Sequence, residues 1–125
     1  RLILAVDYGG KWDITEAAKY FANRVADGSM SSDEITPELF EKQMSLENLP
    51  APDLCIRTGG DIRLSNFMLW QMAYTELYFC DVLWPDFDEH NLIKAFSDFS
   101  CRERRFGIRK AGIISALKDE YRVPI

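Results

Sequence analysis

The chain has 125 residues, of which 47% are hydrophobic, and its formal net charge at pH 7 is -5. This length and apolar fraction fit one globular domain with a core, and the acidic balance argues against nucleic-acid binding, which needs a basic surface. Three widely spaced cysteines and one histidine argue against a zinc site and favour reduced thiols in a cytoplasmic setting, and no apolar run approaches the ~20 residues of a membrane span.

The first half of the chain begins with an apolar run and continues with helical patterns. Residues 2–6 are continuously apolar, as expected of a strand that is covered on both faces. Asp13 opens a capping-box pattern, which predicts a helix that ends at Gly28. The Thr-Pro pair at 36–37 predicts a short second helix that reaches Met44.

The second half alternates short strands with helices. Residues 54–56 are predicted as a strand, and residues 67–77 as a helix that is apolar nearly all round and therefore buried. A third strand over 77–83, a turn and cap over 84–88 and an amphipathic helix around 92–99 follow. This order predicts an α/β protein with a parallel β-sheet flanked by helices. Because three strands are few for such a sheet, we expect its N-terminal part to be missing.

Residues 52–67 carry the strongest functional signal. Arg57 ends the predicted strand, a Gly-Gly pair follows, Arg63 comes next, and Ser65 opens a helical pattern. Guanidinium groups bind phosphate bidentately, and a helix start offers free N–H groups. Ligands of open α/β sheets bind at the carboxyl ends of the strands. We interpret this stretch as a diphosphate site.

This interpretation has a simpler alternative. The two arginines could form surface ion pairs with Asp53 and Asp61, and Ser65 could only cap the following helix. The Gly-Gly pair at 9–10 also has two interpretations, because it fits either a tight turn or a second loop at the same edge of the sheet.

Two further charged features need a partner or a ligand. Glu76 lies in an apolar segment, where a carboxylate is costly unless it is paired or bound to a metal. Both a salt bridge to a basic residue and a site for Mg²⁺, which favours carboxylates together with phosphate oxygens, remain open. The basic run 102–110 is either a solvated helix end or a second anion contact.

Four blocks of the sequence, in this order, resemble the cis-prenyltransferases, and within them the undecaprenyl diphosphate synthases of bacteria. The blocks are residues 7–14, 52–67, 70–87 and 104–107. The resemblance identifies residues 1–107 as the C-terminal part of a single cis-prenyltransferase domain. Residues 108–125 form a C-terminal extension to which it gives no role.

The resemblance implies a transferase of isoprenoid biosynthesis that adds isopentenyl diphosphate repeatedly, in cis geometry, to farnesyl or another allylic diphosphate. The product would be a long-chain polyprenyl diphosphate, such as the undecaprenyl precursor used in peptidoglycan and cell wall synthesis. It further implies Mg²⁺ as cofactor, a homodimer, and a cytoplasmic enzyme peripheral to the inner face of the membrane, to which the product is delivered. No nucleic acid is expected as a partner.

Matching positions assign the site residues. By the resemblance, substrate binding falls to Arg57, Arg63, Leu64, Ser65, Arg105 and Gly107, and a metal role falls to Glu76. Of these, Arg105 and Gly107 would reach the active site of the partner subunit in the homodimer.

The family's N-terminal block does not occur in this sequence. In the family that block holds the aspartate that anchors Mg²⁺ and a Gly-Asn-Gly-Arg loop for the allylic diphosphate. We therefore name no catalytic residue in this chain and expect the chain alone to be inactive. The alternative is a non-catalytic partner subunit of a heteromeric cis-prenyltransferase. The complete set Arg57, Arg63 and Ser65 argues against it, because a supporting subunit needs no diphosphate site.

Overall fold

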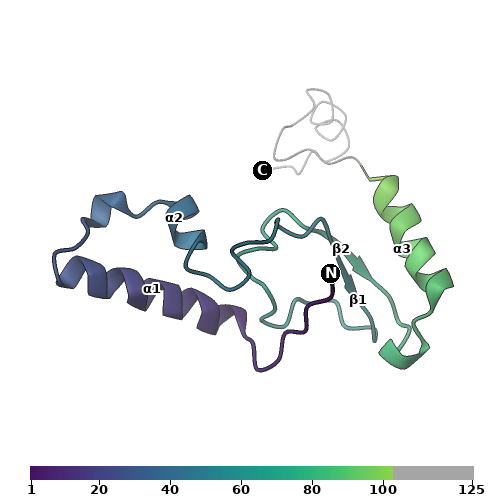
Figure 1. Ribbon diagram of the computed structural model, residues 1–125. Coiled ribbons are helices and arrows are strands. Elements are labelled where there is room, and N and C mark those ends of the chain that lie inside the picture. The colour runs from purple at the N-terminus through teal and green to yellow at the C-terminus, as the bar shows by residue number, and fades with distance from the viewer. Residues whose placement is uncertain (103–125) are drawn as a thin grey trace, which may run out of the picture.

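The computed structural model describes residues 1–102, which form two groups of helices on either side of a small sheet (Figure 1). The elements in chain order are α1 (Gly10–Ala26), a 3-10 turn (Ser32–Glu34), α2 (Pro37–Glu41), β1 (Leu54–Arg57), β2 (Glu76–Phe79), a second 3-10 turn (Trp84–Asp86) and α3 (Glu89–Ser100). α1 and α2 lie together at one end, and α3 lies at the other, beyond the sheet.

The sheet consists of two parallel strands. Leu54 pairs with Glu76 at its amino end, and Arg57 pairs with Phe79 at its carboxyl end. α3 contacts β2, so a helix flanks the sheet. The predicted α/β class and parallel pairing are confirmed. β1 begins at the predicted residue, and β2 begins one residue before its predicted start but ends at Phe79 instead of residue 83.

The predicted strand over residues 2–6 is wrong. These residues form no regular secondary structure, and Leu2 and Val6 are 85% and 82% exposed. A buried strand needs backbone partners on a neighbouring strand and cover on both faces. Within residues 1–102, β1 and β2 pair with each other and form the only sheet, so the apolar run has neither partner nor cover.

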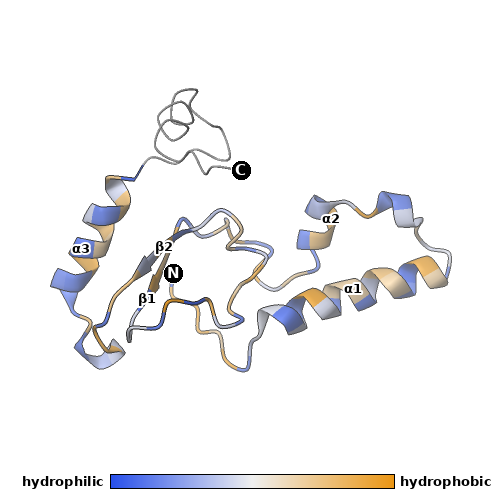
Figure 2. Cartoon of the chain, turned by 180° about the vertical axis from the view of Figure 1, so that it is seen from behind, coloured by the Kyte–Doolittle hydropathy of each residue, from blue (hydrophilic) through white to orange (hydrophobic). Residues whose placement is uncertain are grey.

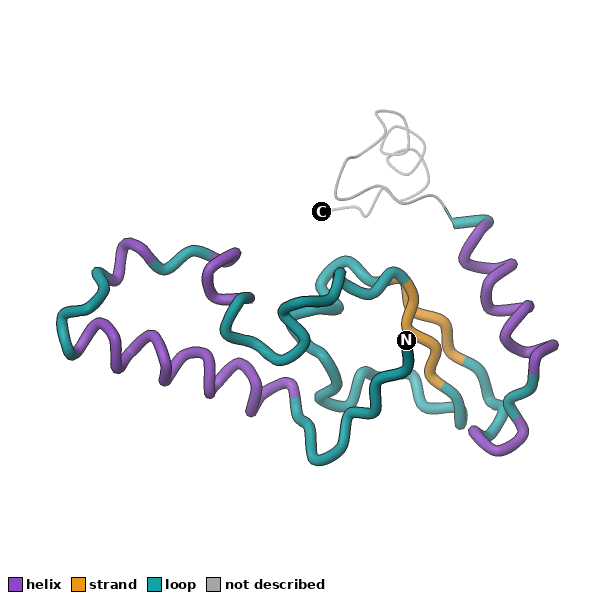
Figure 3. Tube along the Cα trace, in the orientation of Figure 1, coloured by secondary structure: helices purple, strands orange, loops and turns teal. Residues whose placement is uncertain are grey.

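The predicted buried helix over residues 67–77 is also wrong. The connection between the strands is a series of turns without a helix (Figure 3). Ser65, Asn66 and Met68 have positive φ angles of 49°, 65° and 43°. This left-handed conformation breaks the helical hydrogen-bond ladder. Some apolar residues of this segment still contribute to the core, since Met72 is buried, whereas Tyr74 is 74% exposed.

α1 begins four residues before the start predicted from a cap at Asp13, and its first turn is capped by a residue far along the chain. Its first N–H groups, those of Gly10 and Lys11, donate to the backbone oxygen and to Oδ1 of Asn66 at 2.6 and 2.8 Å. The loop that supplies this cap lies so close that a Cβ atom at Gly10 would stand 3.0 Å from the Leu69 nitrogen. The Gly-Gly pair at 9–10 therefore serves close packing of the 65–69 loop on the start of the helix.

Asp13 is not the predicted helix cap but a buried acceptor, 3% exposed. Its carboxylate accepts hydrogen bonds from the Tyr8 hydroxyl at 3.0 Å, the Ser45 nitrogen at 2.8 Å and Gln71 Nε2 at 3.2 Å. Burial by itself would raise the pKa of Asp13, but these hydrogen bonds outweigh it and hold that pKa below its usual value. The carboxylate thus joins three segments of the chain.

The apolar packing around α1 is largely aromatic. Phe21, which is 2% exposed, stacks on Phe40 of α2, and Phe40 stacks on Trp70, with ring centroids 5.6 and 5.0 Å apart. Figure 2 shows hydrophobic and hydrophilic segments alternating along α1, as expected for a helix with one buried side. Among residues 1–102, no helix is both long and apolar enough to cross a membrane.

The predicted caps of α2 and α3 are confirmed. Thr36 Oγ1 accepts a hydrogen bond from the Leu39 nitrogen and caps α2, although this helix ends at Glu41 instead of Met44. Asp88 caps α3 by accepting from the Asn91 nitrogen at 2.9 Å. These caps act within three residues, so the sequence pattern contains both partners.

Substitution Gly10→Ala tests the close approach of the 65–69 loop to α1. The added Cβ would meet backbone atoms that cannot rotate away. We expect the free energy of unfolding to fall by about 1–3 kcal/mol, measured by urea denaturation. Asn23→Ala, at an exposed position of α1, is the control and should stay within about 0.5 kcal/mol. Equal stability of both variants would contradict the packing.

Alkaline unfolding tests the contact between Tyr8 and Asp13. Burial and the hydrogen bond to Asp13 raise the pKa of Tyr8 from 10.0 to about 12. Because the folded value lies above the unfolded one, the protonated phenol stabilises the fold fully below pH 10, and this contribution is lost as the pH rises toward 12. In urea titrations over this interval, Tyr8→Phe should lose stability less steeply than the unchanged chain. Parallel slopes would refute the contact, and Tyr20→Phe controls for removal of a hydroxyl.

Candidate functional site

Arg57, the last residue of β1, organises the loop that follows it. Its Nη1 donates to the Arg63 backbone oxygen at 2.6 Å and to Ser65 Oγ at 2.8 Å. Its Nη2 donates to Asp61 Oδ2 at 2.9 Å, and Arg63 Nη2 donates to the same oxygen at 2.7 Å. We call Arg57, Arg63 and Ser65 the arginine clamp. The structure therefore places both predicted arginines and the predicted serine in one hydrogen-bonded group.

The Gly-Gly turn holds this loop at the carboxyl end of the sheet. Gly59 and Gly60 have φ angles of 85° and 79°, which favour glycine strongly. Their nitrogens donate to the backbone oxygens of Val82 and Cys80 at 2.9 and 3.0 Å. The turn is thus fastened to the segment that leaves β2, and the clamp lies where ligands of open α/β sheets bind.

A cavity of about 380 Å³ adjoins the clamp. Arg57, Arg63, Leu64 and Ser65 line it together, so four of the predicted substrate-binding residues share one cavity. The other lining residues include the apolar Ile56, Phe67, Met72 and Phe79, and Cys55, whose thiol pKa is raised by burial. The cavity therefore offers cationic donors beside an apolar wall.

The alternative interpretation, in which the two arginines form ion pairs, is found in part, because Asp61 pairs with both of them. The pairing and the cavity coexist, since a guanidinium carries more N–H groups than these contacts use. The proposed helix cap at Ser65 is wrong. No helix begins there, since the residue has a positive φ angle, and its hydroxyl accepts from Arg57 instead.

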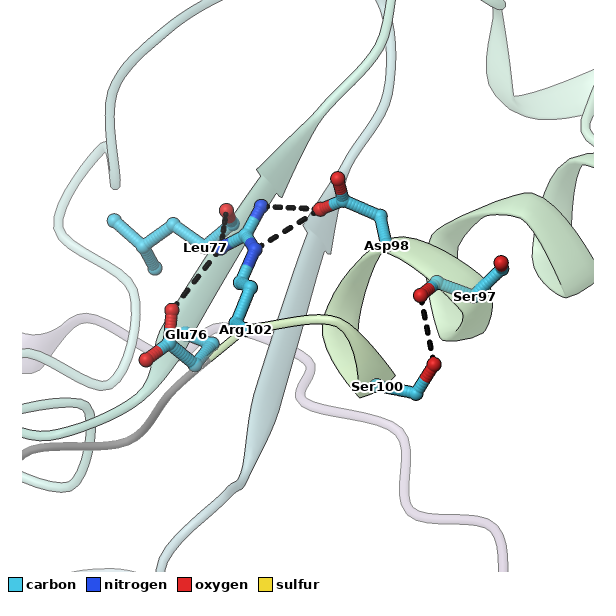
Figure 4. Close-up of polar contacts among 6 residues, drawn as sticks. All are labelled: Glu76, Leu77, Ser97, Asp98, Ser100 and Arg102. Atoms are coloured by element: carbon cyan, nitrogen blue, oxygen red, sulfur yellow. Dashed lines mark hydrogen bonds and ion pairs between the residues drawn. The ribbon is translucent and has the colours of Figure 1, made fainter.

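Glu76 has the salt bridge that its apolar surroundings require. Its Oε2 lies 3.1 Å from Arg102 Nη1, which also donates to the Leu77 backbone oxygen at 2.8 Å (Figure 4). Asp98 at the end of α3 accepts from the same guanidinium. These carboxylate contacts raise the pKa of Arg102 above its ordinary value. Arg102, the first residue of the basic run, was not singled out from the sequence as this partner.

The strand register separates Glu76 from the clamp. Glu76 begins β2 opposite Leu54, whereas Arg57 ends β1, so the two lie roughly 10 Å apart along the strand direction. Residues 1–102 contain no group of three His, Cys, Asp or Glu side chains that could hold a metal ion. Arg105 and Gly107 lie outside the described residues.

Comparisons with known proteins agree with the motifs. A family model described as "Putative undecaprenyl diphosphate synthase" matches residues 1–107. The chain is 51% identical over 106 residues to a farnesyl-diphosphate-specific ditrans,polycis-undecaprenyl-diphosphate synthase of Pseudomonas syringae pv. tomato, covering 85% of this chain and 42% of the relative. It is 54% identical over 104 residues to the enzyme of that name from Vibrio vulnificus, covering 83% and 41%.

Solved structures give the same result. A lavandulyl diphosphate synthase from Lavandula x intermedia, in complex with dimethylallyl diphosphate, matches with a TM-score of 0.80 and 46% identity, over 85% of this chain and 46% of that chain. A "probable undecaprenyl diphosphate synthase" from Campylobacter jejuni matches with a TM-score of 0.66 and 36% identity, over 84% and 46%.

The chain spans less than half the length of these relatives. Over that length the motif order, the matching family model and the sequence identity agree. The chain therefore belongs to the undecaprenyl diphosphate synthase family of cis-prenyltransferases.

Proposed function

We propose that this chain supplies the isopentenyl diphosphate site of a cis-prenyltransferase that condenses this substrate onto farnesyl or another allylic diphosphate. The observation that carries the proposal is the arginine clamp, which lines one cavity at the carboxyl end of β1. The clamp occurs in a chain that is 51% identical, over 106 residues, to a farnesyl-diphosphate-specific undecaprenyl-diphosphate synthase. The bound dimethylallyl diphosphate of the Lavandula relative supports an allylic diphosphate as the second substrate.

The chemistry of the cavity suits an isoprenyl diphosphate. The two guanidiniums offer charge-assisted hydrogen bonds to phosphate oxygens, and the Ser65 hydroxyl adds a donor. Phe67, Met72 and Phe79 offer apolar surface for the five-carbon part of the substrate. An anion would thus be held at one end of the cavity while the carbon chain extends along its wall.

Positioning and electrostatics are what these residues contribute to the reaction. The condensation passes through a developing allylic cation and releases diphosphate, so charge stabilisation matters more than covalent help. Holding isopentenyl diphosphate in a fixed orientation supplies proximity to the allylic carbon. The clamp resides on a strand end and a fastened turn, which gives it a defined direction.

Magnesium remains a prediction from the family. When bound, Mg²⁺ would assist departure of the allylic diphosphate. Glu76 is the residue that the family assigns to it, and its carboxylate is held in place by Arg102. The described residues contain no group of three His, Cys, Asp or Glu side chains, so this carboxylate would hold Mg²⁺ together with phosphate oxygens of the substrate.

We further propose a homodimer and delivery of the product to a membrane. Tyr74 and Trp84 are 74% and 73% exposed on the segment that leads into and out of β2, and aromatic residues are favoured in interface cores. Arg105 and Gly107 would reach the partner's active site, as the family implies. A polyprenyl product is too apolar to remain in water, so a place beside the inner face of the membrane stays the prediction for this enzyme.

The alternative function is a non-catalytic partner subunit of a heteromeric enzyme. Such a subunit would have no need to hold a complete clamp. Because Arg57, Arg63 and Ser65 are all present and converge, we favour the substrate-binding function.

Substitution Arg63→Ala tests the clamp. We would place the matched segment of this chain in the Pseudomonas syringae relative and measure steady-state kinetics of this chimera. Loss of a charged donor should raise the KM for isopentenyl diphosphate roughly 10- to 100-fold and leave the KM for farnesyl diphosphate within about twofold. Arg24→Ala, an arginine of α1 that contacts Ser29 and Tyr20, is the control. An unchanged KM for isopentenyl diphosphate would sink the assignment.

The isolated chain provides a second test. Because its sequence lacks the family's aspartate-bearing block, we expect no prenyl transfer from the purified 125-residue chain. The assay would use radiolabelled isopentenyl diphosphate with farnesyl diphosphate and Mg²⁺, and the chimera would serve as the active control. Labelled polyprenyl product above the enzyme-free blank would show that this chain contains a complete catalytic site.

A further inference from the structure

Asp61 lies between the two guanidiniums of the arginine clamp. Its Oδ2 alone accepts a hydrogen bond from each of them, at 2.9 Å from Arg57 and 2.7 Å from Arg63. Two cations this close repel each other. A single shared carboxylate oxygen therefore fixes both the distance between the guanidiniums and the direction in which each faces the cavity.

We propose that Asp61 is a positioning residue for diphosphate binding, which sets the spacing of Arg57 and Arg63 before the substrate arrives. The proposal rests on the function proposed above for this cavity. Arg57 is already tied to the Arg63 backbone and to Ser65. The Arg63 side chain has one such tie, to Asp61, among the described residues, so the position of Arg63 depends most on this carboxylate.

The ion pairs of Asp61 contribute little to the stability of the fold. Its side chain is 45% exposed and that of Arg63 is 65% exposed, and ion pairs at such exposure stabilise a fold very little. The Gly59-Gly60 turn, which is fastened to Cys80 and Val82, already sets the path of the backbone. What the carboxylate adds is the orientation of the Arg63 side chain, which would otherwise sample many rotamers, relative to the guanidinium of Arg57.

A second role for the carboxylate predicts the opposite result. If Asp61 acted only as a local negative charge, it would compete with the diphosphate, and its neutralisation would strengthen binding. If Asp61 positions the guanidiniums, its neutralisation weakens binding although the site becomes more positive. The sign of the change in affinity therefore separates the two roles.

The experiment is calorimetric titration of the 125-residue chain with inorganic pyrophosphate and with isopentenyl diphosphate, for the unchanged chain and for Asp61→Asn, Asp61→Glu and Asp81→Asn. Asp61→Asn should weaken both ligands roughly tenfold, the usual effect of losing a charge-assisted hydrogen bond. Asp61→Glu keeps the carboxylate and should recover most of this loss. Asp81→Asn removes the same charge from the neighbouring loop and should not weaken binding. Asp81 is close to the turn, since its Oδ1 would lie 3.3 Å from a Cβ at Gly60.

Each outcome decides the proposal. Binding by Asp61→Asn that is equal to or tighter than that of the unchanged chain would overturn the positioning role and leave the clamp intact. Absence of binding by the unchanged chain would overturn the diphosphate site itself, together with this inference. Melting temperatures of all variants should agree within about 2 °C, so a weakened Asp61→Asn with an unchanged melting temperature supports positioning, whereas a matching loss of stability would overturn it.

Discussion

The contact between Asn66 and the start of α1 is the constraint on which the fold and the site both depend. An α-helix begins with N–H groups that have no partner in the helix, and here the main chain and the side chain of Asn66 accept from Gly10 and Lys11. To reach them, the chain takes positive φ angles at Ser65, Asn66 and Met68. The same local geometry directs the Ser65 hydroxyl toward Arg57. Helix capping and formation of the clamp are thus two results of one turn.

An acidic chain with a net charge of -5 maintains an anion site because the positive charges are gathered locally. Arg57 ends a strand and Arg63 follows a turn fixed by two left-handed glycines, while Asp61 holds both guanidiniums at one oxygen. The resulting group has one net positive charge and keeps N–H groups for a ligand. At the other end of the sheet, Arg102 pairs with both Glu76 and Asp98, which leaves that group with one net negative charge, and the strand register keeps the two charged groups apart.

The predictions from sequence were accurate where both partners of an interaction lie within a few residues. The caps at Thr36 and Asp88 and the convergence of Arg57, Arg63 and Ser65 across the Gly-Gly turn have this property. The errors concern interactions between distant segments. Asn66 caps a helix 55 residues earlier, and Asp13 accepts from Ser45 and Gln71, which are 32 and 58 residues later. Periodicity could not show these contacts, and it made residues 67–77 resemble a helix. Residues 2–6 fit a strand by composition, but a strand also requires a neighbour.

The interactions that stabilise the fold are largely separate from those that shape the site. Phe21, Phe40 and Trp70 form an apolar stack near α1, and the buried Asp13 joins three segments through hydrogen bonds. Such buried contacts contribute most of the stability of a small domain. The ion pairs of the clamp are partly exposed, and pairs of this kind contribute about 0–1 kcal/mol each. Their value lies in orienting charged groups toward the cavity. Substitutions in the clamp therefore act on ligand affinity, while substitutions around Asp13 and the aromatic stack act on folding, and this division allows binding and stability to be measured independently in one chain.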